Sequence, residues 1–111
     1  MPGRGRRPLL SWANIAIAMV ANDRFPEAIA QARLAIPEFP PDSGRIAEYP
    51  WLALIAAESQ NGQDAEARAD LQKFLAIPRT WHTIAEIQKF PYFAANPKLL
   101  EGIRRAGMPA E

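Results

Sequence analysis

The sequence predicts an all-α fold in which antiparallel helix hairpins stack on one another, with about six helices in total. Three observations support this class. Apolar residues recur at helical spacing along most of the chain, a shift of 39 residues aligns one segment with the next, and most of the 11 prolines fall at the edges of helical patterns.

The internal repeat defines two units, expected at about residues 10–37 and 45–78. Six of the 25 aligned pairs are identical: Trp12 with Trp51, Ala18 with Ala57, Asn22 with Asn61, Glu27 with Glu66, Ala28 with Ala67 and Ala30 with Ala69. Self-similarity at this period is typical of arrays in which each unit is a helix pair.

The first unit is expected to form helices at about residues 10–22 and 26–36, joined by a turn at Asp23-Arg24. Pro26 suits the first helical position, where its missing N–H would have no partner. The inward stripe of the second helix consists of Ala28, Ile29, Ala32, Ala35 and Ile36. Its small alanines allow close helix packing.

The second unit follows a loop that contains Pro37, Pro40 and Pro41. Pro50 either lies in the first turn of a helix that starts at about Glu48 or kinks a longer helix, and we favour the first interpretation. After the Asn61-Gly62-Gln63 turn, a second helix runs to Pro78. Its apolar stripe consists of Ala67, Leu71, Phe74 and Leu75.

Residues 79–107 are expected to form C-terminal capping helices that cover the exposed face of the second unit. Thr80 or Arg79 could open a helix that stops before Pro91. Asn96-Pro97 predicts the start of the last helix, with Asn96 as its cap, and Gly107 predicts its end.

Composition limits the function. The chain has 13 Lys plus Arg against 12 Asp plus Glu, and this near balance argues against nucleic acid and anionic membranes as partners. It has no cysteine, so disulfides and thiolate metal sites are excluded. Arg4, Arg6 and Arg7 give residues 1–8 the character of a disordered basic arm. An alternative hypothesis is a nucleic-acid-associated accessory protein that uses this arm, and salt-dependent DNA binding before and after its deletion would test it.

The first 21 residues imitate the layout of a secretory signal peptide, because a basic stretch precedes an apolar run. Trp12 and Asn14 interrupt that run, and the same stretch forms half of the internal repeat. We therefore expect a cytoplasmic protein rather than an exported one.

No catalytic constellation is recognisable, and we expect no enzyme activity, cofactor or metal. His82 is the only histidine, and Glu86, one helical turn away, is more often a surface contact than an acid–base partner. Asp64, Glu66 and Asp70 are expected to serve the helix dipole and solubility.

The remaining candidate site is a surface. In stacked helix pairs the first helices line a concave groove, and this groove is expected to bind a protein or peptide, such as an amphipathic helix or the chain's own symmetry mate. The expected partner-binding residues are Asn14, Ile17, Ala21, Tyr49, Leu52, Ala56 and Gln60. The alternative is that Tyr49 and the tryptophans simply belong to the core.

The repeat pattern resembles the tetratricopeptide repeat (TPR). The residues that carry the resemblance are Trp12, Ile15, Ala16, Asp23, Phe25, Ala28, Ala35 and Pro40 in the first unit, and Trp51, Leu54, Ile55, Gly62, Asp64, Ala67 and Phe74 in the second. Asp23 departs from the usual turn glycine, Asp64 from the usual aromatic residue, and Ile55 and Phe74 from small residues. The resemblance covers about residues 10–78 and implies a right-handed superhelix that binds protein.

Residues 96–109 look like the closing segment of bacterial class III adenylate/guanylate cyclase-like proteins, whose tetratricopeptide tails end in a similar leucine-rich stretch. This resemblance implies the C-terminal interaction or regulatory region of a signalling protein, or a stand-alone relative of one. No part of a cyclase catalytic domain lies in this sequence, so that activity is not implied.

Overall fold

The computed structural model describes residues 9–40, 43–77 and 80–111, apart from the side chains of Leu9 and Leu10. All regular elements in these ranges are helical, which confirms the all-α class. They are α1 (Leu9–Ala21), α2 (Phe25–Ala35), the 3-10 helices η1 (Ile36–Glu38) and η2 (Gly44–Glu48), α3 (Tyr49–Gln60), α4 (Asp64–Leu75), α5 (Ile84–Gln88), α6 (Pro91–Ala94) and α7 (Pro97–Ala106). The predictions about the basic arm, Pro41, Pro78 and Arg79 lie outside the described residues.

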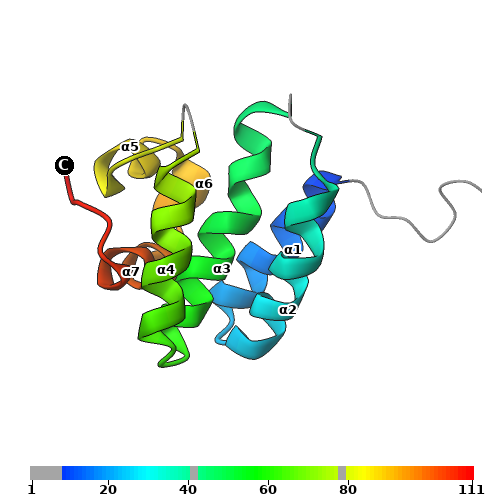
Figure 1. Cartoon of the computed structure of the whole chain (residues 1–111), viewed down its shortest axis with the longest axis horizontal. Coiled ribbons are helices and arrows are strands. Elements are labelled where there is room, and N and C mark those ends of the chain that lie inside the picture. The colour runs from blue at the N-terminus through cyan, green and yellow to red at the C-terminus, as the bar shows by residue number, and fades with distance from the viewer. Residues whose placement is uncertain (1–8, 41–42, 78–79) are drawn as a thin grey trace, which may run out of the picture.

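Helices α1–α4 form two antiparallel hairpins that repeat in structure as they do in sequence (Figure 1). Shifted by 39 residues, α1 and α2 coincide with α3 and α4 to within one residue at each end. The hairpins lie side by side, because α3 packs against both helices of the first hairpin. Pro50 lies in the first turn of α3, as favoured from the sequence.

Helix α3 is the centre of the fold. It packs against α1, α2, α4 and α7, and each of its residues from Leu52 to Ser59 is buried. Its neighbours present small residues toward the interior, and the buried ones include Ala28, Ala32 and Ala67. Small side chains at these positions let the helix axes approach closely, so the apolar stripes predicted for α2 and α4 do face the core.

The first C-terminal helix begins later than predicted. Thr83, rather than Thr80 or Arg79, caps α5, because its Oγ1 accepts a hydrogen bond from the Glu86 N–H (3.2 Å) and Glu86 Oε1 accepts one from the Thr83 N–H (3.0 Å). Thr80 is buried and donates its hydroxyl to the carbonyl of Ile77 instead (3.2 Å). The short helix α6, which begins at Pro91, was not predicted.

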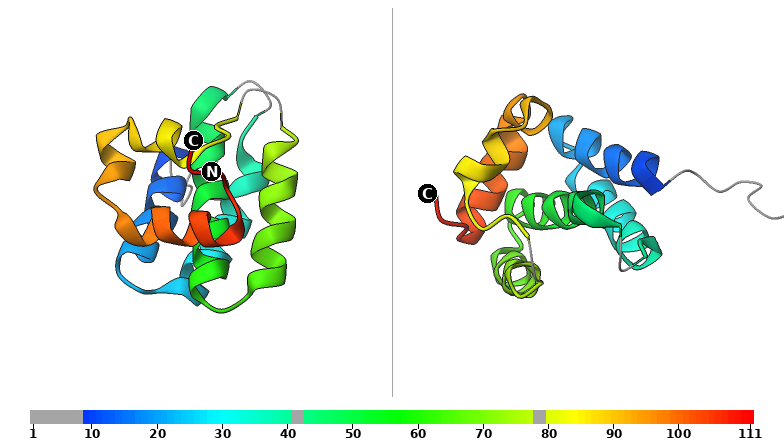
Figure 2. Two further views of the ribbon diagram at one scale, coloured as in Figure 1. Left: turned by 90° about the vertical axis from the view of Figure 1, so that its left-hand side faces the viewer. Right: turned by 90° about the horizontal axis from the view of Figure 1, so that it is seen from above.

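Helix α7 begins and ends as predicted. Asn96 accepts a hydrogen bond from the Leu99 N–H (3.2 Å), and Gly107 ends the helix with φ of 117°. The placement of α7 differs from a simple lid on the second hairpin. It crosses α3 steeply and also contacts α1 and α4, so the segment α5–α7 covers the first helices of both hairpins (Figure 2).

Candidate functional surface

The residues predicted to line the groove lie on the first helices of the two hairpins. They are Asn14, Ile17 and Ala21 of α1 and Tyr49, Leu52, Ala56 and Gln60 of α3. Five of them contact the segment α5–α7, Leu52 is fully buried, and Ala21 is exposed. The predicted face therefore exists, but the chain itself covers most of it.

The closest contact is between α3 and α7. A Cβ atom placed on Gly102 would lie 2.6 Å from the carbonyl oxygen of Ala56 and 2.8 Å from its Cα, so only glycine fits there without a shift of one helix. Gln60, one turn along α3, donates its side-chain amide to the carbonyl of Lys98 (2.9 Å).

The start of α3 is covered by aromatic rings. The ring centroid of Tyr49 lies 4.9 Å from that of Phe93 in an edge-to-face arrangement and 6.4 Å from that of Trp81 in a stacked one. Phe93 and Trp81 are buried. Tyr49 is therefore a packing residue on this side of the molecule, in agreement with the alternative interpretation of the sequence.

The segment α5–α7 also reaches α1. Asn96 donates its side-chain amide to the carbonyl of Ile17 (3.2 Å), and the Tyr92 hydroxyl donates to Oδ1 of Asn14 (2.7 Å). These two hydrogen bonds attach α6 and the residue before α7 to α1.

The free energy gained by burying apolar side chains holds this covering segment in place. Ile87, Phe93, Leu99 and Ile103 of the covering segment are fully buried. Burial of each such side chain contributes roughly 1.5–3 kcal/mol, so their release would cost roughly 6–12 kcal/mol, comparable with the whole stability of a small domain. The groove expected over α3 is therefore filled by the chain's own helices.

One side of α1 stays accessible, and of the residues predicted for the groove it includes Asn14 and Ala21. It holds an open hollow of about 470 Å³ lined by Ser11, Asn14, Ile15 and Ala18. Ala21 continues this face toward the end of the helix and is exposed. We call these five residues the α1 face.

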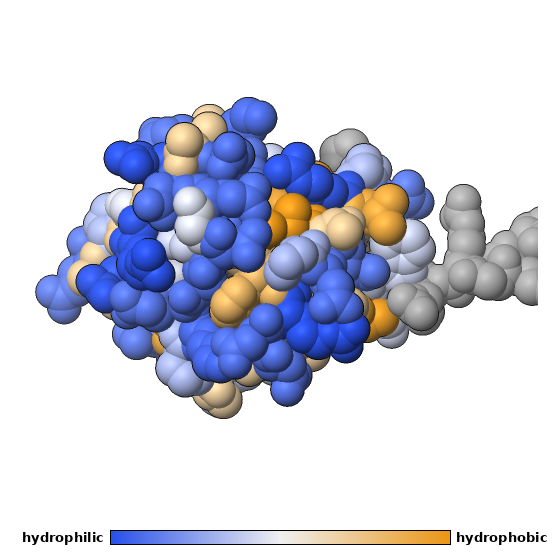
Figure 3. All heavy atoms as spheres, turned by 90° about the horizontal axis from the view of Figure 1, so that it is seen from below, coloured by the Kyte–Doolittle hydropathy of each residue, from blue (hydrophilic) through white to orange (hydrophobic). Residues whose placement is uncertain are grey.

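The α1 face carries no charge, nor does any residue of the helix from Leu9 to Ala21. The other long surface helices differ, because α2 exposes Glu27 and Arg33, and α4 exposes Glu66 and Arg68 among others. The end of the molecule where the two hairpin turns lie is mostly hydrophilic (Figure 3). An uncharged helix with an accessible side is thus a local exception.

His82 and Glu86 have a structural role. Glu86 Oε1 accepts hydrogen bonds from the backbone N–H groups of His82 (2.8 Å) and Thr83 (3.0 Å). These bonds lower the pKa of the Glu86 carboxyl, because they stabilise its charged form. The carboxylate is occupied at the start of α5, and the described residues contain no group of three or more potential metal ligands.

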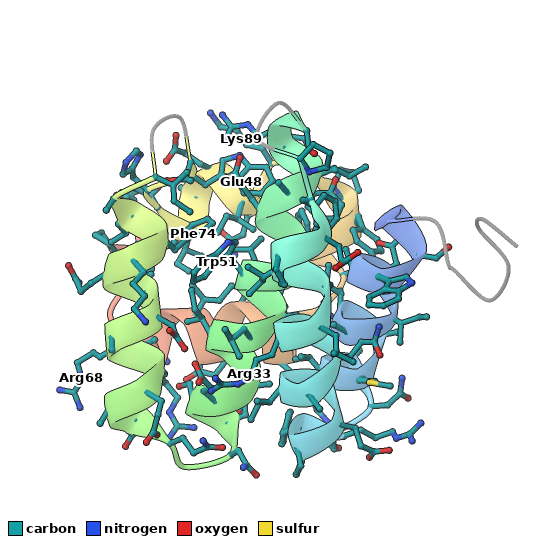
Figure 4. All side chains as sticks on the ribbon, turned by 45° about the vertical axis from the view of Figure 1, so that its right-hand side comes forward. Arg33, Glu48, Trp51, Arg68, Phe74 and Lys89 are labelled. Atoms are coloured by element: carbon teal, nitrogen blue, oxygen red, sulfur yellow. The ribbon has the colours of Figure 1, made fainter. Side chains whose placement is uncertain are left out.

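Sequence reasoning missed a buried carboxyl group, that of Glu58 on α3. Its side chain is fully buried, and its Oε2 accepts a hydrogen bond from Arg33 of α2 at 3.0 Å. Figure 4 shows Arg33 reaching from α2 across α3. The Oε1 atom of Glu58 has no hydrogen-bond partner within the described part of the chain. The signal was present in the sequence, since Glu58 is the only charged residue between Tyr49 and Gln60.

The surroundings of Glu58 disfavour the charged form of its carboxyl, because the side chain is fully buried. Burial raises the pKa of its carboxyl to about 8, and a hydrogen bond with Asp70 of α4 raises it further in the same direction, while Arg33 opposes the change. A protonated Glu58 can donate to Asp70 and accept from Arg33. The hydrogen bond from Arg33 joins α2 to α3 at this buried carboxyl.

The fold and its surface define a small all-α protein with two like hairpins, a filled concave side and one uncharged accessible helix face. Comparison with protein-family models, curated proteins and solved structures finds no match. None of the helices in the described ranges has the length and apolar character needed to cross a membrane.

Proposed function

We propose that the chain is a helical-repeat protein-interaction module that binds another protein through the α1 face. The observation that supports this function is the absence of charge on a helix whose outer side is open. A helix without charged residues on any side is normally buried, so this one is expected to be covered by another protein surface.

The chemistry of the α1 face defines the partner. Ser11 and Ala18 are small and allow the close approach of a second helix, while Ile15 supplies apolar area. Asn14 adds an amide that requires a polar contact. A suitable partner is an amphipathic helix that presents small apolar residues and no charge to this face.

The resemblance of residues 96–109 to cyclase-like tails supports a setting for this interaction. In that setting the chain is the C-terminal interaction or regulatory region of a cytoplasmic bacterial signalling protein related to the class III cyclases. The tetratricopeptide resemblance of residues 10–78 supports the same class of function. Inspection of the coding sequence directly upstream tests this setting, because a catalytic domain in frame is expected there.

A charge placed on the α1 face tests the interaction. Wild-type protein, the Ala18→Glu variant and the Leu34→Glu variant are immobilised and used to capture proteins from the native host. Ala18 and Leu34 are both exposed, but Leu34 lies on α2, away from the hollow. A captured protein is then purified, and its affinity for each variant is measured.

We expect the purified partner to bind wild type and Leu34→Glu alike, and Ala18→Glu at least tenfold more weakly, because the new charge would be desolvated at the contact. If Ala18→Glu binds every captured protein as tightly as the wild type does, the α1 face is not the interaction surface.

A further inference from the structure

The buried carboxyl group of Glu58 has an oxygen atom whose hydrogen bonding is incomplete. Its Oε2 accepts from Arg33 at 3.0 Å, but its Oε1 has no partner among the described residues, and the side chain is 0% exposed. A buried acceptor without a donor is costly, and native proteins rarely leave one. We therefore expect either a donor at this oxygen or a proton on it.

The group next to Glu58 on α4 is a second carboxyl. Asp70 lies within hydrogen-bonding reach of the Glu58 carboxyl. Two ionised carboxylates can only accept hydrogen bonds, so they repel each other, whereas a protonated carboxyl donates to the other one. Asp70 holds the remaining charge more easily than Glu58, because its side chain is 15% exposed and Lys73 Nζ lies 3.7 Å from its Oδ1.

We propose that Glu58 and Asp70 share one proton in the folded protein, and that the resulting hydrogen bond is a pH-sensitive latch that holds α4 on α3. A protonated Glu58 donates to Asp70 and accepts from Arg33, so both of its oxygens are satisfied. The latch does not depend on the proposed function of the α1 face.

The charged groups around Glu58 determine what happens when the proton leaves. From α2, Arg33 attracts the ionised carboxylate, and from α4, Asp70 and Glu66 repel it. Loss of the proton therefore removes the hydrogen bond to Asp70 and replaces it with repulsion, while the ion pair with Arg33 remains. Helix α4 is released in this way, and α2 stays attached to α3.

The other helices that pack against α3 bring no charge close to Glu58. Helix α1 has no charged residue. Helix α7 lies on the opposite side of α3, because Glu58 is about 200° around the helix from Ala56, which contacts Gly102. Arg45 and Glu48 of η2 pair with each other before the start of α3, and Glu48 is about 15 Å from Glu58 along the helix axis. The balance is thus set by α2 and α4.

The first hairpin has no such latch. At the 39-residue shift, Met19 and Gln31 occupy the positions of Glu58 and Asp70, and neither of them titrates. Met19 is half-buried and packs against the apolar core. The same helix pair therefore forms without the two carboxyls, so the carboxyl pair is an addition specific to the second hairpin.

The direction of the pH effect follows from proton binding. Burial raises the pKa of the Glu58 carboxyl from 4.5 to about 8. Separation of α4 would admit water and remove Asp70, so the pKa of this carboxyl would return toward its ordinary value. The closed state then holds a proton that the open state releases, and rising pH favours opening between about 4.5 and 8. Above that range both states are ionised, and the effect levels off.

Carbon NMR of the side-chain carboxyls in the full chain tests the shared proton. We expect a Glu58 pKa of about 8, and Asp70→Asn should lower this pKa by about one unit or more, because the neighbouring negative charge is gone. Asp64→Asn is the matched control at the exposed start of the same helix and should leave the Glu58 pKa unchanged. A Glu58 pKa near 4.5 in the wild type, or one that Asp70→Asn does not lower, would overturn the shared proton.

Amide hydrogen exchange tests the latch itself. Protection factors, which correct for the intrinsic pH dependence of exchange, are compared for α4 and α2 at about pH 5.5 and about pH 7.5. We expect the protection of α4 to fall at least tenfold more than that of α2, within the limit of about a hundredfold that one proton sets over this interval. Glu58→Gln should remove the difference, because its amide donates to Asp70 and accepts from Arg33 as the protonated carboxyl does.

Parallel loss of protection in α2 and α4 of the wild type would overturn the latch, as would a difference that persists in Glu58→Gln. Neither measurement involves a partner protein, so failure of the latch and failure of the proposed function are separate results.

Discussion

Asp23 and Gly62 hold the same backbone position in the two hairpin turns. Their φ angles are 63° and 82°, and each donates its N–H to a carbonyl three residues earlier, in Val20 and Ser59 respectively, at 3.2 Å in both cases. The next N–H in each turn also bonds to a carbonyl five residues earlier. These bonds join Arg24 to Met19 at 2.9 Å and Gln63 to Glu58 at 2.8 Å. Both hairpins thus turn through the same Schellman motif.

Replacement of Asp23 by glycine should stabilise the protein. A left-handed backbone strains any residue with a Cβ, and its relief is worth roughly 1 kcal/mol. The ion pair between Asp23 and Lys98 would be lost, but both side chains are substantially exposed, so we expect that loss to be smaller. Asp23→Gly should therefore raise the free energy of unfolding in urea by a few tenths to about 1 kcal/mol.

Gly62→Ala is the matched control, because it introduces the same strain in the second hairpin. It should lower the free energy of unfolding by roughly 1 kcal/mol. A lower stability of Asp23→Gly than of the wild type would show that the ion pair outweighs the strain.

Several features could be predicted because each depends on residues close in sequence. They are the helix pair of each repeat unit, the position of Pro50, the Asn96 cap and the end of α7 at Gly107. The start of α5 was also a local signal, since Thr83 is followed three residues later by Glu86 in a capping box, a pattern absent at Thr80.

The cover over the predicted groove depends on tertiary packing and could not be derived from periodicity. The helical pattern of α7 indicates that one side is buried, but not against which surface. Its one clue was Gly102, because a glycine inside a helix usually has a packing reason. The close approach to Ala56 is that reason. The partners of Glu58 come from α2 and α4, so the buried carboxyl group also required the fold.

The Glu58 carboxyl should make stability fall as pH rises. Its pKa is about 8 in the folded protein and near the ordinary value of a glutamic acid when unfolded, so between those values the folded state holds a proton that the unfolded state has released. The free energy of unfolding should therefore decrease between about pH 4.5 and pH 8, by on the order of a few kcal/mol.

Urea titrations of wild type, Glu58→Gln and Glu66→Gln at several pH values check this expectation. Glu58→Gln should flatten the dependence in this window, because a neutral amide replaces the titrating group. Glu66 lies on α4 and is exposed, so Glu66→Gln should keep most of the slope. Parallel curves for wild type and Glu58→Gln would assign the pH dependence to other groups.

Gly102→Ala should destabilise the docking of α7. The added methyl group would overlap the carbonyl of Ala56, so α7 must shift away from α3, and overpacking of this kind costs about 1–3 kcal/mol. Alanine is otherwise the better helix former by about 1 kcal/mol, so any loss measured understates the steric effect. Arg105→Ala, on the exposed side of the same helix, is the control and should change stability little.

Thermal unfolding and amide hydrogen exchange of the Gly102→Ala variant check this expectation. Faster exchange confined to α5–α7 is expected, with the hairpins of α1–α4 protected as before. A variant as stable as the wild type would limit the cost of separating the two helices to about the 1 kcal/mol that alanine gains as a helix former.

Asn96 should contribute more than a helix cap, because it bonds two elements at once. Its oxygen caps α7 through the Leu99 N–H, and its amide group satisfies the carbonyl of Ile17. Asn96→Ala should therefore remove about 1 kcal/mol for the cap and a further ~0.5–1.5 kcal/mol for the hydrogen bond to the Ile17 carbonyl, which keeps its partner within α1. Urea unfolding of the full chain measures the sum.

Asn96→Ser separates the two contributions. A serine hydroxyl can still accept from the Leu99 N–H, but it is too short to reproduce the reach of the amide to Ile17 on α1. Its stability should lie between those of wild type and Asn96→Ala. Equal stability of Asn96→Ser and the wild type would show that the hydrogen bond to Ile17 adds nothing, and that α7 is held on α1 by its apolar contacts alone.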